Sequence, residues 1–267
     1  MLTEFLNLLP CLRVFDLAQP YCAGMPHHPN HPPFLYGLSK RHGDYVAPGG
    51  VSSASEALAL GGHAGTHIDA LCHFSRDGLL HGGAEAAGAQ SWTAGLSRLA
   101  VDTIAPILRR GVLLDIAGHE GVAALPEDYE ITPAKLDAAA HAQRVALEPG
   151  DVALLRTGWG RYWDDAARFV NQMRGPGPDE AGARWLSRAG VFAAGSDTLA
   201  FEAVPAPSMP VHVHLLVESG IHILECLNLE ELAAARAWEF LFVGAPLKIR
   251  GGTGAPIRPL ALAEARG

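Results

Sequence analysis

Residues 111–116 (GVLLDI) and 151–157 (DVALLRT) are two short apolar runs that decide the fold class of this chain. Each run is rich in Val and Leu and has the length of a buried strand. Between them Thr132 precedes Pro133, which predicts a helix start with the Thr hydroxyl as its cap, because the missing N–H of proline costs nothing at the first helical position. Strand, helix and strand in this order predict an α/β protein.

The same alternation continues toward the C-terminus. Asp179 has a short polar side chain that can cap the start of a helix, and Gly190 and Gly220 can each end a helix. Four further elements are therefore predicted: a helix over 179–190, a strand over 191–194, a helix over 211–219 and a strand over 221–224.

The first half of the chain is less regular. It shows only short extended pieces, such as 14–17 and 51–55, separated by Pro- and Gly-rich loops around 20–50. The chain has no internal repeat, and its 30 Gly and 19 Pro are scattered and not gathered in a linker. We therefore expect residues 1–267 to form a single α/β domain with a mixed β-sheet flanked by helices.

Composition excludes several classes of function. The formal net charge of −8 and the lack of any Lys or Arg block argue against a nucleic-acid partner. The N-terminus does not resemble a secretory signal, and no apolar run approaches the eighteen or so residues of a membrane span. The four cysteines are too few and too scattered for a disulfide framework. We expect a cytoplasmic protein with no nucleic-acid partner and no membrane partner.

Residues 63–73 (HAGTHIDALCH) concentrate the groups that can carry chemistry. Imidazole nitrogen and carboxylate oxygen are the ligands of catalytic Zn and Mn sites, and His63, His67, Asp69 and His73 supply four of them within eleven residues. No single regular element brings all four together, but a bend at Gly65 would, since glycine adopts positive φ readily. The chain has 13 His, so ordinary polar residues in a loop are the alternative.

The string H-x-G-T-H-x-D in this segment resembles the signature of the metal-dependent cyclase family, which includes bacterial kynurenine formamidases and isatin hydrolases. The resemblance extends over most of the chain, through five further segments: GMPHHPNHPPF at 24–34, SRDG at 75–78, LLDIAGHEGVAALPEDYEITP at 113–133, LLRTGWGRYW at 154–163 and LLVESGIHILECLNLEEL at 215–232.

This resemblance implies a swivelling β/β/α-like fold, a homo-oligomer and a divalent metal cofactor, one or two ions of Zn or Mn. It implies that His63, His67 and Asp69 bind the metal and that His73 is the catalytic acid/base. It also implies a second group of ligands, which matches His212 and Glu225.

The two positions of the second group also make physical sense without the family. Glu225 follows an apolar strand, where an unpaired carboxylate would be costly and a metal ion would offset the cost. The alternative is that Glu225 pairs with an arginine such as Arg156. His214 is the rival to His212 as ligand.

A bound divalent ion acidifies its water and polarises a carbonyl, which is the chemistry of amide hydrolysis. We therefore predict a hydrolase of a C–N bond in a small amide, either an aryl-formamide such as N-formylkynurenine or a cyclic amide such as isatin, with His73 moving protons. A non-hydrolytic cyclase, dehydratase or small-molecule binding protein on the same scaffold is the alternative. Leu71 stands where the formamidases carry proline, and we expect this difference to change the pocket wall without disturbing the ligands.

Two other groups could shape the substrate site. His27, His28 and His31 lie in a Pro-rich loop that could reach the site mouth. Trp159 and Trp163 could line an aromatic pocket, although core packing explains two Trp four residues apart equally well.

Overall fold

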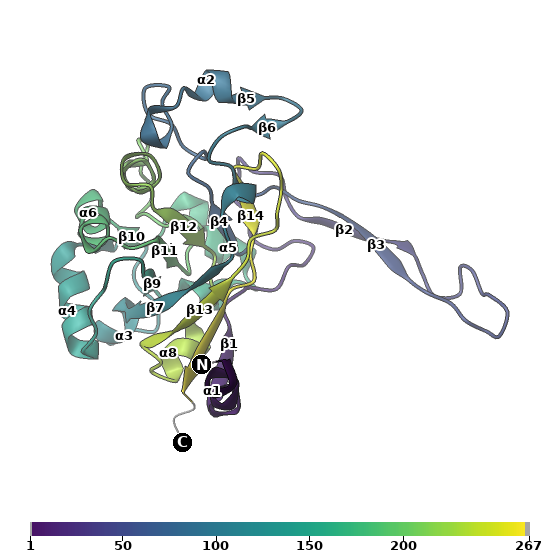
Figure 1. Ribbon diagram of the computed structural model, residues 1–267, viewed down its shortest axis with the longest axis horizontal. Coiled ribbons are helices and arrows are strands. Elements are labelled where there is room, and N and C mark those ends of the chain that lie inside the picture. The colour runs from purple at the N-terminus through teal and green to yellow at the C-terminus, as the bar shows by residue number, and fades with distance from the viewer. Residues whose placement is uncertain (1, 265–267) are drawn as a thin grey trace.

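The computed structural model describes residues 2–264 and is built around one curled, mixed sheet of nine strands (Figure 1). The four central strands β7, β9, β11 and β12 run parallel, and each strand outside them is antiparallel to its neighbour. In spatial order the strands are β1 (Leu12–Asp16), β15 (Leu260–Glu264), β13 (Glu239–Gly244), β7 (Ile107–Asp115), β9 (Val152–Arg156), β11 (Ala193–Ser196), β12 (His222–Glu225), β4 (His67–Asp69) and β14 (Gly254–Pro256).

The central strands are buried on both faces, which explains why their sequences are continuously apolar. In β9, Val152 and Leu154 point into one core, while Ala153 and Leu155 point into the other. This alternation follows from the two-residue period of a strand. The predicted strands at 111–116, 151–157, 191–194 and 221–224 correspond to β7, β9, β11 and β12.

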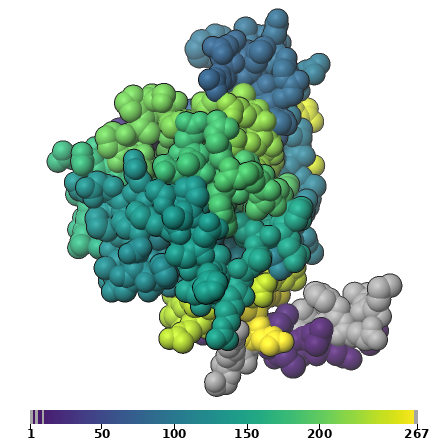
Figure 2. Space-filling view, turned by 90° about the vertical axis from the view of Figure 1, so that its left-hand side faces the viewer, coloured from purple at the N-terminus to yellow at the C-terminus, as the bar shows by residue number. Residues whose placement is uncertain are grey.

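Helices cover one face of the sheet (Figures 1 and 2). The side chains that the central strands direct to this face form a core with residues of the helices. These are Leu136 of α4 (Pro133–Gln143), Ala183 of α6 (Glu180–Ala189) and Leu215. Figure 2 views this face from outside, with the helical segments in teal and green over the sheet.

The opposite face is closed mainly by the curl of the sheet itself. Phe15 of β1, Phe242 of β13 and Ala261 of β15 share one core with Leu154 of the central strand β9. The short helix α8 (Glu230–Ala234) adds Leu232 to the same core.

The remaining elements are short. Three two-stranded sheets pair β2 (Leu35–Lys40) with β3 (Ser55–Ala59), β5 (Gln90–Ser91) with β6 (Gly95–Leu96), and β8 (Glu130–Ile131) with β10 (Gly177–Pro178). The other helices are α1 (Leu2–Leu8), α2 (Ala86–Ala89), α3 (Ile116–His119), α5 (Ala166–Val170) and α7 (Pro210–His212), with 3-10 turns at Leu9–Cys11, His81–Gly83, Val101–Thr103, Trp159–Tyr162 and Asn171–Met173.

The predicted helix ends are confirmed in part. The Asp179 side chain accepts a hydrogen bond from Gly182 N, and Gly190 ends α6 in the left-handed region. Thr132 precedes α4, but its hydroxyl makes no cap hydrogen bond. The predicted helix over 211–219 is divided into α7 and a π-helical segment, Val213–Ser219, that ends at Gly220.

The extended piece predicted at 51–55 exists, but its position in the sequence was predicted wrongly. The strand there is β3, which starts at Ser55 and pairs with β2 in a hairpin that projects far from the body (Figure 1). The segment around 20–50, expected to be loop, therefore contains β2. We refer to residues 35–59 as the arm.

Across residues 2–264, we find no helix with the length and apolar character needed to cross a bilayer. The four cysteines are free thiols, of which Cys72 and Cys226 are buried.

Candidate metal centre

Two neighbouring strands place three possible ligands on one face of the sheet. His67 and Asp69 are two residues apart in β4, so both side chains point to the same side. The antiparallel pairing of β4 with β12 sets Glu225 directly opposite His67. Residues directly opposite on one face of an antiparallel pair have neighbouring side chains. Strand pairing thus brings Glu225 beside His67 and Asp69, which lie far from it in the sequence.

The loop before β4 returns His63 to this face. Gly65 has φ of +64°, the bend expected from the sequence, and a Cβ built there would lie 2.6 Å from the Tyr21 ring. Tyr21 Oη lies 2.7 Å from the carbonyl oxygens of both Ala64 and Thr66. The tyrosine therefore holds the loop on both sides of the glycine.

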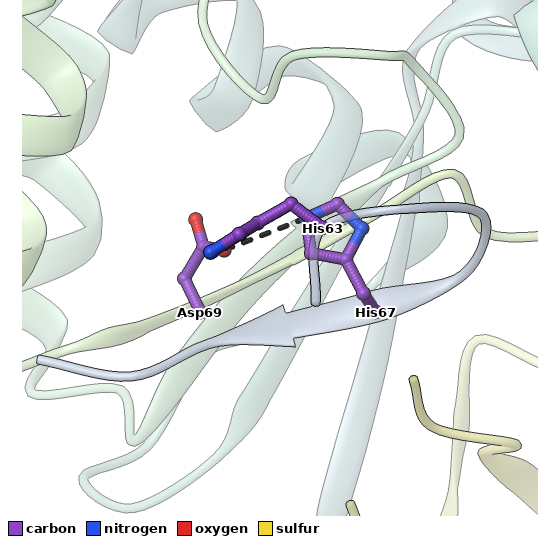
Figure 3. A group of neighbouring side chains, drawn as sticks. All are labelled: His63, His67 and Asp69. Carbon is purple, nitrogen blue, oxygen red and sulfur yellow. Dashed lines mark hydrogen bonds and ion pairs between the residues drawn. The ribbon is translucent and has the colours of Figure 1, made fainter. Parts of the chain in front are cut away.

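His63 uses both of its ring nitrogens in this structure. Nδ1 lies 2.7 Å from Asp69 Oδ1 (Figure 3). Nε2 lies 2.9 Å from Thr253 Oγ1. His67 differs, because its Nδ1 donates to the Gly65 carbonyl at 2.8 Å and its Nε2 has no hydrogen-bond partner. The free Nε2 of His67 points at the two carboxylates.

His212, at the end of α7, enters the cluster from the helical side. Glu202 Oε1 lies 2.6 Å from its ring Nδ1, which leaves Nε2 facing the carboxylates. That Nε2 lies 3.2 Å from Glu225 Oε1 and 3.8 Å from Asp69 Oδ2.

His214 lies elsewhere. Its ring nitrogens are 2.7 Å from Glu218 Oε2 and 2.8 Å from Ser187 Oγ, so both have partners away from the cluster. Of the two rival histidines, the fold brings only His212 to Asp69 and Glu225.

Within residues 2–264, the ion-pair partners of Glu225 are histidines and not an arginine. Arg156, the partner considered from the sequence, instead pairs with Asp115 at 2.7 Å and Glu230 at 2.8 Å. Glu225 Oε1 accepts a hydrogen bond from Phe201 N at 2.7 Å, which fixes the carboxylate between His67 and His212.

The cluster forms two trios that share Asp69, namely His63, His67 and Asp69, and Asp69, His212 and Glu225. All five residues are buried or nearly so, and within each trio the donor atoms lie within 4.8 Å of one another. His67 Nε2 lies 3.4 Å from both Asp69 Oδ1 and Glu225 Oε2, too far for a good hydrogen bond. Two ligands that each lie about 2.1 Å from one tetrahedral ion are roughly 3.4 Å apart. Of the three buried side-chain atoms that lack a hydrogen-bond partner within residues 2–264, His67 Nε2 and Asp69 Oδ2 belong to these trios, and the third is Oε2 of Glu202, the residue beside His212. The residues of the trios therefore fit a divalent metal ion.

The buried negative charges of the cluster also favour the binding of a cation. Burial raises the pKa of Glu225, but the neighbouring His212 and His67 outweigh this and lower it to about 2. Burial lowers the pKa of His67, but Asp69 and Glu225 outweigh it and raise the value to about 10. Two buried carboxylates therefore stay ionised, and either protons on the histidines or a metal ion must balance their charge.

His73 lies against this cluster but outside both trios. Its ring stacks on the His63 ring, with centroids 3.8 Å apart. The Phe74 ring packs against it in an edge-to-face arrangement. Burial is the main cause that lowers the pKa of His73, to about 3. The imidazole is thus neutral at neutral pH, the form that can accept a proton.

A cavity of about 390 Å³ opens onto the cluster. His28 and His31 of the Pro-rich loop line it together with His73, and the His31 ring lies 5.1 Å from that of His63. Phe74, Leu199 and Met209 form an apolar part of the wall. The loop histidines 28 and 31 therefore reach the site, as the sequence suggested, whereas His27 is not in the lining.

The structure corrects the expectation about Leu71 and decides between the two alternatives for the Trp pair. Leu71 packs into the core on the helical side of the sheet and is not among the residues that line the cavity, contrary to the expectation that this position shapes the wall. Trp159 and Trp163 are also buried away from it, and their ring N–H groups donate to the carbonyls of Leu125 and Pro20. Core packing is the role that the structure gives both Trp.

Glu202 is the residue that sequence reasoning missed. It is 1% exposed, and its Oε1 lies 2.6 Å from the His212 ring Nδ1. A signal was present, because Glu202 stands alone in the apolar run LAFEAV at 199–204. Like Glu225, Glu202 is an isolated carboxylate among apolar residues, where an unpaired charge would be costly.

Known proteins resemble this chain in sequence and in structure. Residues 15–203 match the sequence family described as "Putative cyclase". An isatin hydrolase from Roseibium aggregatum is 29% identical over 213 residues, 77% of this chain and 73% of the relative. A crystal structure described as a novel cyclase superposes with a TM-score of 0.89 at 30% identity and covers 98% of this chain and 90% of its own. Isatin hydrolase A from Ralstonia solanacearum superposes with a TM-score of 0.77 at 26% identity, covering 99% of this chain and 97% of its own.

Proposed function

The chain belongs to the cyclase family, and on that premise we propose that it is a metal-dependent hydrolase that cleaves a C–N bond of a small amide. The observation that carries the proposal is the pair of trios sharing Asp69 at the base of a cavity. The isatin hydrolases among the similar proteins support hydrolysis as the reaction class.

His63, His67, Asp69, His212 and Glu225 are the residues that would hold the metal. A bound divalent ion, Zn or Mn, supplies water of lowered pKa and polarises the substrate carbonyl. Asp69, which is common to both trios, is placed to contact two ions if both are bound. Glu202 orients the His212 ring, since its carboxylate fixes the proton on Nδ1 and leaves Nε2 free to ligate.

We assign His73 as the acid/base. Its neutral ring lies beside His63 and lines the cavity, so it can take a proton from the attacking water and return it to the leaving nitrogen. A nitrogen leaving group requires this return, because an amide anion is too basic to leave unprotonated.

The cavity favours an uncharged substrate. Among the residues that line it within the described chain there is no Lys or Arg, while Phe74, Leu199 and Met209 offer apolar contact. An amino-acid head group such as that of N-formylkynurenine would bring a carboxylate for which the cavity lining offers no Lys or Arg partner. These features support a neutral cyclic amide such as isatin over an aryl-formamide with a charged side chain.

The test is a comparison of isatin, N-formylkynurenine and simple uncharged aryl-formamides with protein stripped of metal and with protein reloaded with Zn or Mn. We expect ring opening of isatin by the reloaded protein, and at most about a hundredth of that rate after verified metal removal. Hydrolysis that survives metal removal would refute the metal-dependent reading, and binding of all three without turnover would favour a binding protein.

A further inference from the structure

The loop at residues 25–34 forms part of the cavity wall and is anchored at both ends. Met25 and Phe34 are buried in one small core. Four of the residues between them are proline, namely Pro26, Pro29, Pro32 and Pro33. Because each proline fixes φ, the loop has few backbone conformations open to it, and the side chains that it directs into the cavity are positioned before a ligand arrives.

A tight turn within this loop presents three polar side chains to the cavity. His31 N donates to His28 O at 2.9 Å, and Asn30 N donates to His28 Nδ1 at 3.1 Å. His28, Asn30 and His31 all line the cavity. None of the three holds the metal or moves a proton in the proposed function.

The ring of His31 is packed against two other rings. Its centroid lies 5.1 Å from that of His28, in an edge-on arrangement, and 5.1 Å from that of His63. The side chain is half-buried, and within residues 2–264 neither of its ring nitrogens has a hydrogen-bond partner. An imidazole carries an N–H whether it is neutral or protonated, so His31 can donate a hydrogen bond to a molecule in the cavity.

The position of His31 indicates which part of a substrate it would meet. The reacting carbon of an amide bears an oxygen, a nitrogen and one further substituent. In the proposed function the oxygen lies at the metal centre and the nitrogen at His73, which leaves the further substituent. The His31 ring lies closer to the ring of His63, at 5.1 Å, than to that of His73, at 6.3 Å. His31 is therefore placed beside the metal centre and away from the leaving nitrogen.

We propose that His31 donates a hydrogen bond to a second carbonyl oxygen of the substrate, on the carbon next to the scissile carbonyl. This inference rests on the proposed function and narrows the substrate class to amides with two adjacent carbonyls, of which isatin is one. A formamide carries only hydrogen at that position, and a simple lactam carries CH₂, so neither offers an acceptor. A site that bonds a polar group of its substrate discriminates against an analogue that lacks the group, because its own donor is then left unpaired.

The rest of the lining suits the remainder of such a substrate. Phe74, Leu199 and Met209 come from segments other than the loop and are apolar. The cavity, of about 390 Å³, thus combines polar groups from one loop with apolar groups from elsewhere in the chain. A flat aromatic ring that carries both carbonyls along one edge has the same division between polar and apolar parts.

Equilibrium binding to the full-length protein stripped of metal tests the inference without turnover. The ligands are isatin and oxindole, which is the same lactam without the second carbonyl, and isothermal titration calorimetry measures both dissociation constants. We expect the wild-type protein to bind isatin more tightly than oxindole. His31→Phe keeps an aromatic ring between His28 and His63 but removes the donor, so it should weaken isatin binding about five- to tenfold and leave oxindole binding unchanged.

Two further variants separate the hydrogen bond from a structural effect. His31→Gln supplies an amide N–H and should restore most of the preference for isatin. His27→Phe makes the same substitution in the same loop at a residue outside the cavity lining, so it should leave both dissociation constants unchanged. Circular dichroism and the metal content after reloading check that each variant keeps its fold and its metal centre.

Turnover by protein reloaded with Zn or Mn gives an independent measurement. His31→Phe should raise KM for isatin with little change in kcat, because a contact with a carbonyl that does not react is made equally in the ground state and the transition state. Hydrolysis of formanilide, which lacks the second carbonyl, should not change.

A wild-type protein that binds isatin no more tightly than oxindole would overturn the inference, and so would a folded His31→Phe variant that keeps the wild-type preference. Either result, in a protein whose reloaded form hydrolyses formanilide, would leave metal-dependent amide hydrolysis standing. A preference for isatin that is lost in His31→Phe, in a protein that hydrolyses no amide, would support the contact and refute the proposed function.

Discussion

Glu202 holds His212 through two contacts with one carboxylate oxygen. Oε1 accepts from the backbone N of His212 at 3.0 Å and lies 2.6 Å from its ring Nδ1. The first contact holds the backbone of His212, and the second holds its ring. Together they keep Nε2 directed at Asp69 and Glu225. In the proposed metal centre, Glu202 would thus orient the ligand His212 without being a ligand itself.

The conservative substitution Glu202→Gln should weaken metal binding by about ten- to a hundredfold, the range typical for carboxylates that support a histidine ligand. The amide can still accept from Nδ1, but it lacks the charge and brings an N–H into a buried position. Isothermal titration with Zn measures the change, and Glu85→Gln on the surface is the control. An affinity equal to that of the wild type would show that Glu202 plays only a structural part.

Substitution should distinguish the role of His212 from that of His214. His212→Ala removes a donor of one trio and should lower the metal content measured by elemental analysis. His214→Ala removes only the contacts with Ser187 and Glu218, so it should keep the metal and lower the free energy of unfolding by about 1 kcal/mol. The opposite pattern of metal loss would contradict the assignment.

His73→Ala should retain the metal, because His73 belongs to neither trio, yet lose at least about a hundredfold in kcat, the low end of acid–base effects. Elemental analysis and turnover on the same sample keep the two effects apart. Turnover near that of the wild type in a metal-loaded sample would remove His73 from the mechanism.

Metal affinity should fall as pH falls. Burial lowers the pKa of His67, but Asp69 and Glu225 outweigh it and raise the value to about 10, so at neutral pH the metal-free ring holds a proton that the ion must displace. Below a pH of about 10 the apparent affinity should therefore drop about tenfold per pH unit for each displaced proton. Competition titrations at about pH 6, 7 and 8 measure this dependence, and a constant dissociation constant would contradict it.

The sequence was sufficient for those parts of the molecule in which local pattern and tertiary environment agree. Residues 152–156 are apolar because both faces of β9 are buried, and Asp179 and Gly190 bound α6 by local hydrogen bonding and backbone freedom. The motif at 63–69 likewise anticipated Gly65 as the bend and brought together His63, His67 and Asp69.

The arm could not be predicted in the same way. Its strands bury neither face in this chain, so no alternation of apolar and polar residues marks β2 or β3. Glu202 and the choice of His212 over His214 depended on contacts between α7 and a distant loop, which only the tertiary structure supplies. The position of Leu71 in the core, away from the cavity, depended on the same packing.

The most direct test of the account is a crystal structure of the protein loaded with Zn or Mn, with anomalous diffraction measured at the absorption edge of the metal. The account predicts anomalous density between the trios, with Asp69 and His67 Nε2 or His212 Nε2 at about 2.0 to 2.2 Å from an ion. Density elsewhere, or none at Asp69 in a protein shown to be fully loaded, would contradict it.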